Sequence, residues 1–195
     1  EKQVFRFEDN GGRDVAMRFD LTVPFARFTA EHFAELYLPF KRYHISKVWR
    51  GEKPQAGRYR EFVQCDIDTV GSDSAVSDFE ILNVMKAALN AIGVEKITIH
   101  VNHRGIFNRF LNKLGLLEKS EDILRSVDKL AKVGEEAVKA ELVEYSGDEA
   151  KASEILKYIS SKGSFLEILS QLETMAGGPD TDTQRMKDIY EMMKA

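Results

Sequence analysis

The stretch that decides the fold is residues 40–70, which read FKRYHISKVWRGEKPQAGRYREFVQCDIDTV. Residues 41–50 and 58–70 both alternate polar and apolar side chains, which is the period of a β-strand. Residues 51–57 between them, GEKPQAG, carry the glycines and the proline that are typical of a turn. The stretch therefore predicts a long antiparallel hairpin.

The even-numbered residues of this hairpin form an unusual set. Because successive strand residues point to opposite faces, one face of the second strand presents a cation, an aromatic ring, an amide and two carboxylates, namely Arg60, Phe62, Gln64, Asp66 and Asp68. The first strand brings four polar residues to one face in the same way, namely Arg42, His44, Ser46 and Arg50. If the strands pair, the two polar faces combine into one surface, here called the polar floor. The opposite face, with Val63, Cys65 and Ile67, is largely apolar and is expected to pack against helices, with Cys65 as a small core residue.

Positive charge concentrates on the same hairpin. Residues 41–60 carry seven basic side chains and one acid, Glu52, in a chain whose net charge is −4. Such a concentration indicates an anionic ligand, with a solvated surface stripe as the alternative. Arginine forks can bind phosphate, Phe62 can stack on a base, and Gln64 and Asp68 can accept from an ammonium or an imidazole N–H. The polar floor thus suits a molecule with a polyphosphate, a flat ring and an ammonium, although exposed strands also alternate polar residues for solubility alone.

The rest of the first half predicts further sheet and two helices. Residues 4–8 and 15–20 are strand-like and flank an Asn-Gly-Gly hairpin turn. Residues 22–36 and 72–91 are expected to be helices, the first with Thr22 as its N-cap, and residues 96–101 a further strand. From residue 103 on the periodicity is helical, with helices expected at 105–114, 121–133, 135–145, 149–160, 164–175 and 183–193. The sequence thus predicts an α+β fold, with a partial antiparallel sheet domain at 1–102 and an all-helical subdomain at 103–195.

Composition narrows the class of protein further. The chain is 43% hydrophobic and 31% charged, which is typical of a folded globular protein, and no apolar run reaches the length of a membrane span. Cys65 is its single cysteine, so no internal disulfide is possible, which fits the reducing cytoplasm. No His, Cys and carboxylate set has ligand spacing, so no metal site is expected in the chain itself. A Gly-Lys-Ser/Thr phosphate loop is absent as well.

Residues 40–68 resemble motif 2 of the class II aminoacyl-tRNA synthetases, in the form that the histidine enzymes have. Upstream, MRFDLTVPFAR at residues 17–27 is similar to the Arg-Tyr-Asp-Leu-Thr-Val-Pro-Phe-Ala-Arg segment of their eukaryotic-type members, and residues 111–142 resemble the start of their insertion domain. The resemblance implies a partial class II catalytic core at 1–102, followed by the helical insertion domain at 103–195.

The resemblance also implies a reaction, in which ATP, with Mg²⁺, activates L-histidine for transfer to tRNA(His). Arg50 would be the catalytic residue, on the α-phosphate and the carboxylate of histidine. The residues expected to bind ATP are Arg50, Glu52, Arg58, Arg60 and Phe62. Those expected to bind histidine are Asp20, Leu21, Thr22, Arg50, Gln64 and Asp68. An enzyme of this family is expected to be a cytoplasmic homodimer with no membrane partner.

Several parts of the family pattern are not recognised in residues 1–195: motif 1, the Arg-Gly-Leu-Asp-Tyr-Tyr histidine signature, motif 3 and the anticodon-binding domain. We therefore expect a truncated piece of such an enzyme that does not aminoacylate tRNA by itself. One alternative is a catalytically inactive, synthetase-like regulatory subunit or domain, but such proteins tend to lose the motif 2 side chains that are present here. The other is a scaffold or RNA-binding module made of the helical part, whose 14 basic and 17 acidic residues give it little support.

Overall fold

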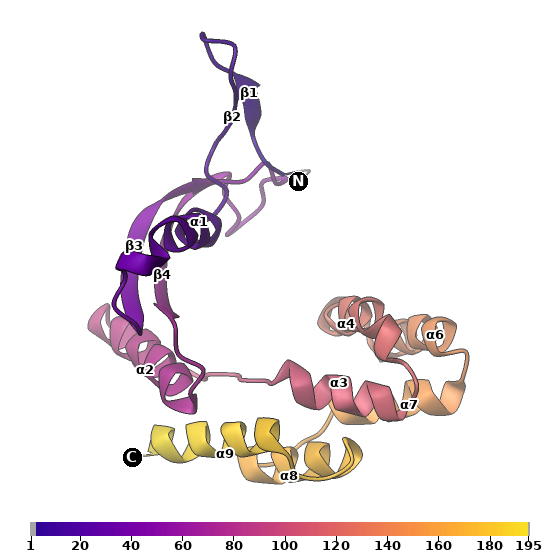
Figure 1. Cartoon of the computed structure of the whole chain (residues 1–195). Helices are drawn as coiled ribbons and strands as arrows, with labels where there is room; N and C mark the ends of the chain where they lie inside the picture. Colours follow the sequence, from indigo (N-terminus) through magenta and orange to yellow (C-terminus); the bar gives the residue numbers. More distant parts are fainter. Residues whose placement is uncertain (1–2, 195) are drawn as a thin grey trace. The chain divides into compact units, whose positions relative to one another are not determined.

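The computed structural model describes residues 3–194, which form two compact units, one up to residue 85 and the other from residue 86 onward. Figure 1 shows the elements of the first unit, an antiparallel α+β arrangement as predicted. Its strands and helices are β1 (Arg6–Glu8), β2 (Asp14–Ala16), α1 (Thr22–His32), β3 (Phe40–Trp49), β4 (Glu61–Val70) and α2 (Ala75–Ala91), the last of which runs on into the second unit.

The long hairpin is present, and its register makes the polar floor. Strands β3 and β4 pair antiparallel, with Arg42 opposite Asp68, Ser46 opposite Gln64, and Val48 opposite Phe62. Because residues directly opposite each other project to the same side of a sheet, the even-numbered residues of both strands share one face. The smaller hairpin β1–β2 is also confirmed, although its strands are shorter than predicted.

Helix α1 is drawn beside the β3–β4 ribbon in Figure 1, and its Phe25 ring contacts Arg42 of the polar floor. Leu21 and Phe25 are buried, and the Phe25 ring lies 6.1 Å from that of Phe40. Thr22 was predicted as the N-cap of this helix, and that prediction is wrong. The N-cap position is Leu21, and it is the Asp20 carboxylate that accepts the Val23 N–H, at 2.9 Å. A carboxylate suits the positive end of the helix dipole.

The odd-numbered face of β3–β4 is only partly covered. Helix α2 approaches one end of it, where Lys41 pairs with Glu80 at 2.6 Å and a cavity of about 360 Å³ is lined by both elements. The rest stays open, and Tyr43 is 76% exposed. Cys65 is exposed too, so its predicted place in a core is wrong within the described residues. The cause is that only this one helix covers the face in the part of the chain that the structure describes.

The second unit consists of helices joined by short turns. They are α3 (Arg104–Lys113), α4 (Ser120–Val127), α5 (Leu130–Val133), α6 (Glu135–Ser146), α7 (Glu149–Ile159), α8 (Phe165–Met175) and α9 (Thr181–Lys194). The single helix predicted at 121–133 is thus two helices, because the chain turns at Asp128 and Lys129. The strand predicted at 96–101 is not a strand. Ile99 and Val101 instead line an apolar cavity with residues of α8 and α9, so their alternation reflects packing against helices.

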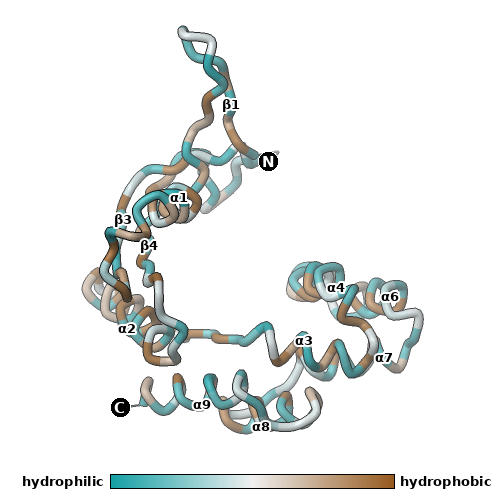
Figure 2. Tube along the Cα trace, viewed as in Figure 1, coloured by the Kyte–Doolittle hydropathy of each residue, from teal (hydrophilic) through white to brown (hydrophobic). Residues whose placement is uncertain are grey.

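A hydrophobic core holds the helical unit together. Fifteen buried residues form one cluster, in which the Phe110 ring stacks on Tyr158 with centroids 4.6 Å apart. Figure 2 shows hydrophobic and hydrophilic residues interspersed along these helices, the pattern of helices that bury one side. None of the helices among residues 3–194 has the length and apolar character needed to cross a membrane.

Candidate functional site

Two buried oxygens on the polar floor lack a hydrogen-bond partner. They are Oε1 of Gln64 and Oδ2 of Asp68, which stand on the same face of β4. Arg42 Nη2 lies 2.9 Å from that Asp68 oxygen, but the contact is an ion pair without the direction of a hydrogen bond. A buried acceptor without a donor is costly, and a ligand with several N–H groups would satisfy both. These two residues are among those expected to bind histidine.

The N-terminal end of α1 reaches the same part of the floor. The Arg42 guanidinium donates to the Leu21 carbonyl at 3.0 Å, which fixes the backbone of residues 20–22 beside β3. Asp20 is half-buried here, whereas the Thr22 side chain is exposed. Apart from Arg50, the residues expected to bind histidine therefore come from two segments, 20–22 and 64–68, which Arg42 connects.

Arg50 and Phe62 meet further along the floor. The Arg50 guanidinium carbon lies 5.1 Å from the centroid of the Phe62 ring and 4.7 Å from that of Phe19. Its Nε donates to the Phe19 carbonyl at 3.2 Å, while its backbone N–H donates to Arg60. A guanidinium held on aromatic faces keeps further N–H groups for an anion. The arrangement therefore offers a phosphate donor directly beside an aromatic ring.

The connection between β3 and β4 gathers the other charged residues. Arg58 pairs with the Glu52 carboxylate at 2.7 Å, and Arg60 Nε donates to the Glu52 backbone carbonyl at 3.1 Å. Gln55 and Arg58 close a tight turn through Gly57, whose φ of +74° is one that a side chain would strain. The Arg58 side chain is largely exposed, whereas that of Glu52 is 20% exposed, so the pair is only partly open to solvent.

The structure thus brings the predicted residues together as two groups. One group contains the residues predicted to bind ATP, namely Arg50, Glu52, Arg58, Arg60 and Phe62. The other contains the residues predicted to bind histidine, among which the Thr22 side chain is exposed. Two further residues, Phe19 and Arg42, contact these groups although the sequence assigned them no role. Arg42 was identifiable as a member of the floor by its alternation. Phe19 carried no comparable signal, because its place depends on how residues 17–20 cross β3.

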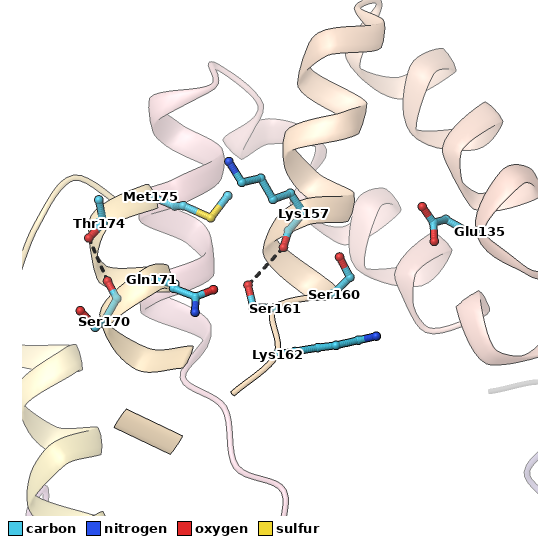
Figure 3. A pocket seen from close by; sticks show the side chains of 9 residues that line it. All are labelled: Glu135, Lys157, Ser160, Ser161, Lys162, Ser170, Gln171, Thr174 and Met175. Carbon is cyan, nitrogen blue, oxygen red and sulfur yellow. Dashed lines mark hydrogen bonds between the residues drawn. The ribbon is translucent and has the colours of Figure 1, made fainter. Parts of the chain in front are cut away.

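A second cavity, in the helical unit, is a weaker candidate. Its volume is about 760 Å³, and it lies between α7 and α8 with Lys157 and Lys162 on its walls. Figure 3 shows these two lysines pointing in different directions, so they do not converge on one anion. The hydroxyls of Ser161 and Thr174 donate to helix carbonyls rather than into the cavity. This geometry does not indicate a particular chemistry.

Comparisons with known proteins agree with the polar floor. A profile of the histidyl-tRNA synthetase family matches residues 1–194. The histidine–tRNA ligase of Treponema denticola is 65% identical over the whole chain, which covers 45% of that protein, and the one of Rhodopirellula baltica is 57% identical over 74% of the chain and 33% of its own length. The chain therefore spans less than half the length of these curated relatives.

Solved structures show the same fold. The histidyl-tRNA synthetase of Nostoc sp. PCC 7120 superposes with a TM-score of 0.84 at 26% identity, over 98% of this chain and 45% of that one. A protein of Bacillus halodurans C described as an ATP phosphoribosyltransferase regulatory subunit/histidyl-tRNA synthetase reaches 0.80 at 20% identity over 100% of this chain and 50% of its own, a likeness of fold alone. From the profile and the identity to curated relatives, this chain belongs to the histidyl-tRNA synthetase family.

Proposed function

We propose that the protein with this chain is a histidine–tRNA ligase, which joins L-histidine to ATP as histidyl-adenylate and then transfers the histidyl group to tRNA(His). The observation that carries the proposal is the polar floor. A phosphate donor set, a buried Gln64 oxygen without a hydrogen bond and the Asp68 carboxylate, which pairs with Arg42, lie there on one face of one hairpin. Membership of the histidyl-tRNA synthetase family supports histidine as the amino acid.

Histidine would lie over Gln64 and Asp68, beside residues 20–22. Its ammonium or its ring N–H would donate to the two buried oxygens that otherwise have no hydrogen bond. Asp20 would contribute a carboxylate, and the backbone at Leu21 and the hydroxyl of Thr22 would complete the site. Because an unpaired buried acceptor is left when a ligand lacks the matching donor, such a site discriminates strongly between ligands.

ATP would lie over the Arg50 end of the floor. Phe62 would stack on adenine, Glu52 would accept from its exocyclic amine, and Arg58 and Arg60 would reach the outer phosphates. The carboxylate of histidine attacks the α-phosphorus, the bond to the β-phosphate oxygen breaks, and pyrophosphate leaves. Arg50 stabilises the charge that builds on the α-phosphate, and removing one such donor typically costs about 10²–10³ in rate.

The proposal includes Mg²⁺ with ATP, held chiefly by phosphate oxygens. Residues 3–194 contain no cluster of three or more His, Cys, Asp or Glu side chains that could hold an ion. We further propose that residues 1–102 form part of the catalytic core and 103–195 the insertion domain, within a cytoplasmic homodimer.

The test places this chain in a protein of full family length. Residues 1–195 replace the matching segment of the Treponema denticola ligase, and amino-acid-dependent ATP–pyrophosphate exchange is measured with each standard amino acid in turn. We expect exchange with histidine alone, and a loss of about 10²–10³ in Arg50→Ala. Lys47→Ala, on the opposite face of the same strand, is the matched control, because its partner is Glu61 and it does not reach the floor.

A folded chimera that exchanges with no amino acid would contradict the proposal. It would favour a synthetase-like regulatory protein, the other description carried by the Bacillus halodurans structure. Equal activity of Arg50→Ala and the parent chimera would leave the ligase reading intact and remove Arg50 from it.

A further inference from the structure

Arg42 is the most connected charged residue of the polar floor. Its side chain is 15% exposed and contacts four groups at once. It pairs with Asp68 at 2.9 Å, donates to the Leu21 carbonyl and to His44 Nδ1, each at 3.0 Å, and lies 3.8 Å from the centroid of the Phe25 ring. A guanidinium has no acceptor, so His44 receives this hydrogen bond on an unprotonated Nδ1.

These contacts belong to three different parts of the chain. Asp68 is on β4, Leu21 and Phe25 are on the segment that enters α1, and Arg42 and His44 are on β3. The two groups of residues that we assign to histidine, 20–22 and 64–68, are more than 40 positions apart in the sequence. Arg42 touches both groups, on the Leu21 carbonyl and on the Asp68 carboxylate.

We propose that Arg42 is a positioning residue for the amino-acid half of the site, which holds Asp68 and the 20–22 backbone at a fixed separation. This inference rests on the proposed function. Arg42 need not touch the substrate, and its Nε is itself buried without a partner, which leaves the guanidinium oriented by the contacts of its two terminal nitrogens. When the groups of a binding site are displaced by about 1 Å, much of the affinity or rate is lost. A residue that holds those groups in place therefore matters as much as one that contacts the ligand.

The ATP half should not depend on Arg42. Arg50 is oriented by Phe19 and Phe62, and the Glu52–Arg60 contact lies in the connection between the strands. A positioning role thus predicts a change in histidine binding with ATP binding unchanged. A purely structural role predicts a loss of folded protein, which lowers the exchange rate at saturating substrates and leaves the KM values for histidine and ATP unchanged.

The experiment compares Arg42→Gln, Arg42→Lys and the control Lys41→Gln in the Treponema denticola chimera. Lys41 directly precedes Arg42 in β3, points to the other face and pairs with Glu80. For Arg42→Gln we expect the KM for histidine to rise about tenfold or more, as for loss of a charge-assisted contact, with the KM for ATP within about twofold. The KM for histidine of Arg42→Lys should lie between those of the parent and Arg42→Gln, because an ammonium keeps the charge but not the planar fork. Lys41→Gln should have the same KM values as the parent.

A second measurement is independent of activity. Amide hydrogen exchange of the 195-residue chain should become faster for Val23 and Phe25 in Arg42→Gln, because the Leu21 carbonyl loses its donor and the start of α1 is released. The amides of residues 44–48 in the β3–β4 ladder serve as the internal reference.

The outcomes separate the two proposals. If the parent chimera shows no histidine-dependent ATP–pyrophosphate exchange, the proposed function is overturned. Amide hydrogen exchange then decides by itself whether Arg42 holds the 20–22 segment. An active parent in which Arg42→Gln leaves the histidine KM unchanged, or raises both KM values equally, overturns the positioning role while the ligase stands. Unchanged exchange at Val23 overturns it too.

Discussion

The two compact units differ in how many hydrophobic side chains they bury. Among the described residues, residues 1–85 bury only three hydrophobic side chains, Leu21, Phe25 and Val48, whereas the helical unit buries a cluster of fifteen residues. Both units contain buried polar atoms without a hydrogen bond, among them the Tyr158 hydroxyl in the helical unit. Those of the hairpin unit include Gln64 Oε1 and Asp68 Oδ2, which stand on the polar floor where a ligand is proposed.

The contrast reflects two uses of burial. Packing apolar surface stabilises a fold, while a buried acceptor without a donor costs stability until a ligand satisfies it. Strain of this kind is expected to collect at functional sites. If this interpretation holds, substitutions in the helical unit should change stability most, and substitutions on the floor should change binding most.

The largest effect is expected from Phe110→Ala in the core of the helical unit. Phe110 is 2% exposed and stacks on Tyr158, so its loss should lower the free energy of unfolding by about 3–5 kcal/mol. Urea unfolding followed by far-ultraviolet circular dichroism measures it. Trp49 is the single tryptophan and lies on β3, so its fluorescence reports the hairpin unit separately. An equal shift of the Trp49 transition would show that the units unfold together and would remove the contrast.

Gln64→Met tests the opposite side of the comparison. Removing an acceptor of a charged donor should weaken histidine binding by about 1.5–3 kcal/mol in the chimera, measured as KM or by calorimetry. The urea midpoint of the hairpin transition should stay or rise, because a side chain of similar shape replaces a buried, unsatisfied oxygen. Gln171→Met in the helical unit is the control and should change neither value. A marked loss of stability in Gln64→Met would mean that the amide has a structural partner.

A smaller effect is expected at the start of α7. The Asp148 carboxylate accepts the Ala150 N–H at 2.7 Å and caps the helix, so Asp148→Ala should cost about 1 kcal/mol. Glu154→Ala, on the exposed side of the same helix, should stay within about 0.5 kcal/mol of the parent. Equal losses in both variants, measured by urea unfolding, would show that helix charge rather than the cap is responsible.

The smallest effect is expected on the stability of the helical unit at low pH. The Ser126 hydroxyl and Lys129 lower the pKa of Glu141 from 4.5, and Lys187 lowers that of Glu173. A carboxyl group with a lowered pKa in the folded state stabilises the fold above pH 4.5 and loses that contribution as the pH falls further. The urea midpoint of the helical transition should thus be level from pH 7 to 5 and fall below about 4.5. Glu141→Gln should flatten this fall, and an unchanged profile would contradict it.

Several features followed from the sequence because their physics is local. Strict alternation in residues 41–50 and 58–70 predicted the hairpin, and the same period assigned Gln64 and Asp68 to one face. Helical periodicity located most helices of residues 103–195 to within a few positions. The motif itself indicated the family that the profile and relatives confirm.

Other features depended on which elements meet. The alternation of Ile97, Ile99 and Val101 predicted a strand, but a strand needs a neighbour, and Ile99 and Val101 pack against helices instead. Cys65 lies on the apolar face as predicted, yet it is exposed because α2 covers only one end of that face. The oxygen that accepts from the start of α1 is that of Asp20 rather than Thr22 for a similar reason. The path of residues 17–21 beside β3 decides which oxygen faces the first free N–H groups.

The sequence by itself determined the hairpin, its polar face and the residues that stand on it, because side-chain direction in a strand depends only on parity. Tertiary structure alone decided that Arg42 joins residues 20–22 to Asp68 and that Arg50 rests between Phe19 and Phe62. Apart from the contact between Arg50 and Phe62, those contacts join residues more than 20 positions apart. No local preference specifies which distant segment crosses a strand, or at what point. That choice depends on the burial of Leu21, Phe25 and Val48 together, which is a property of the folded chain.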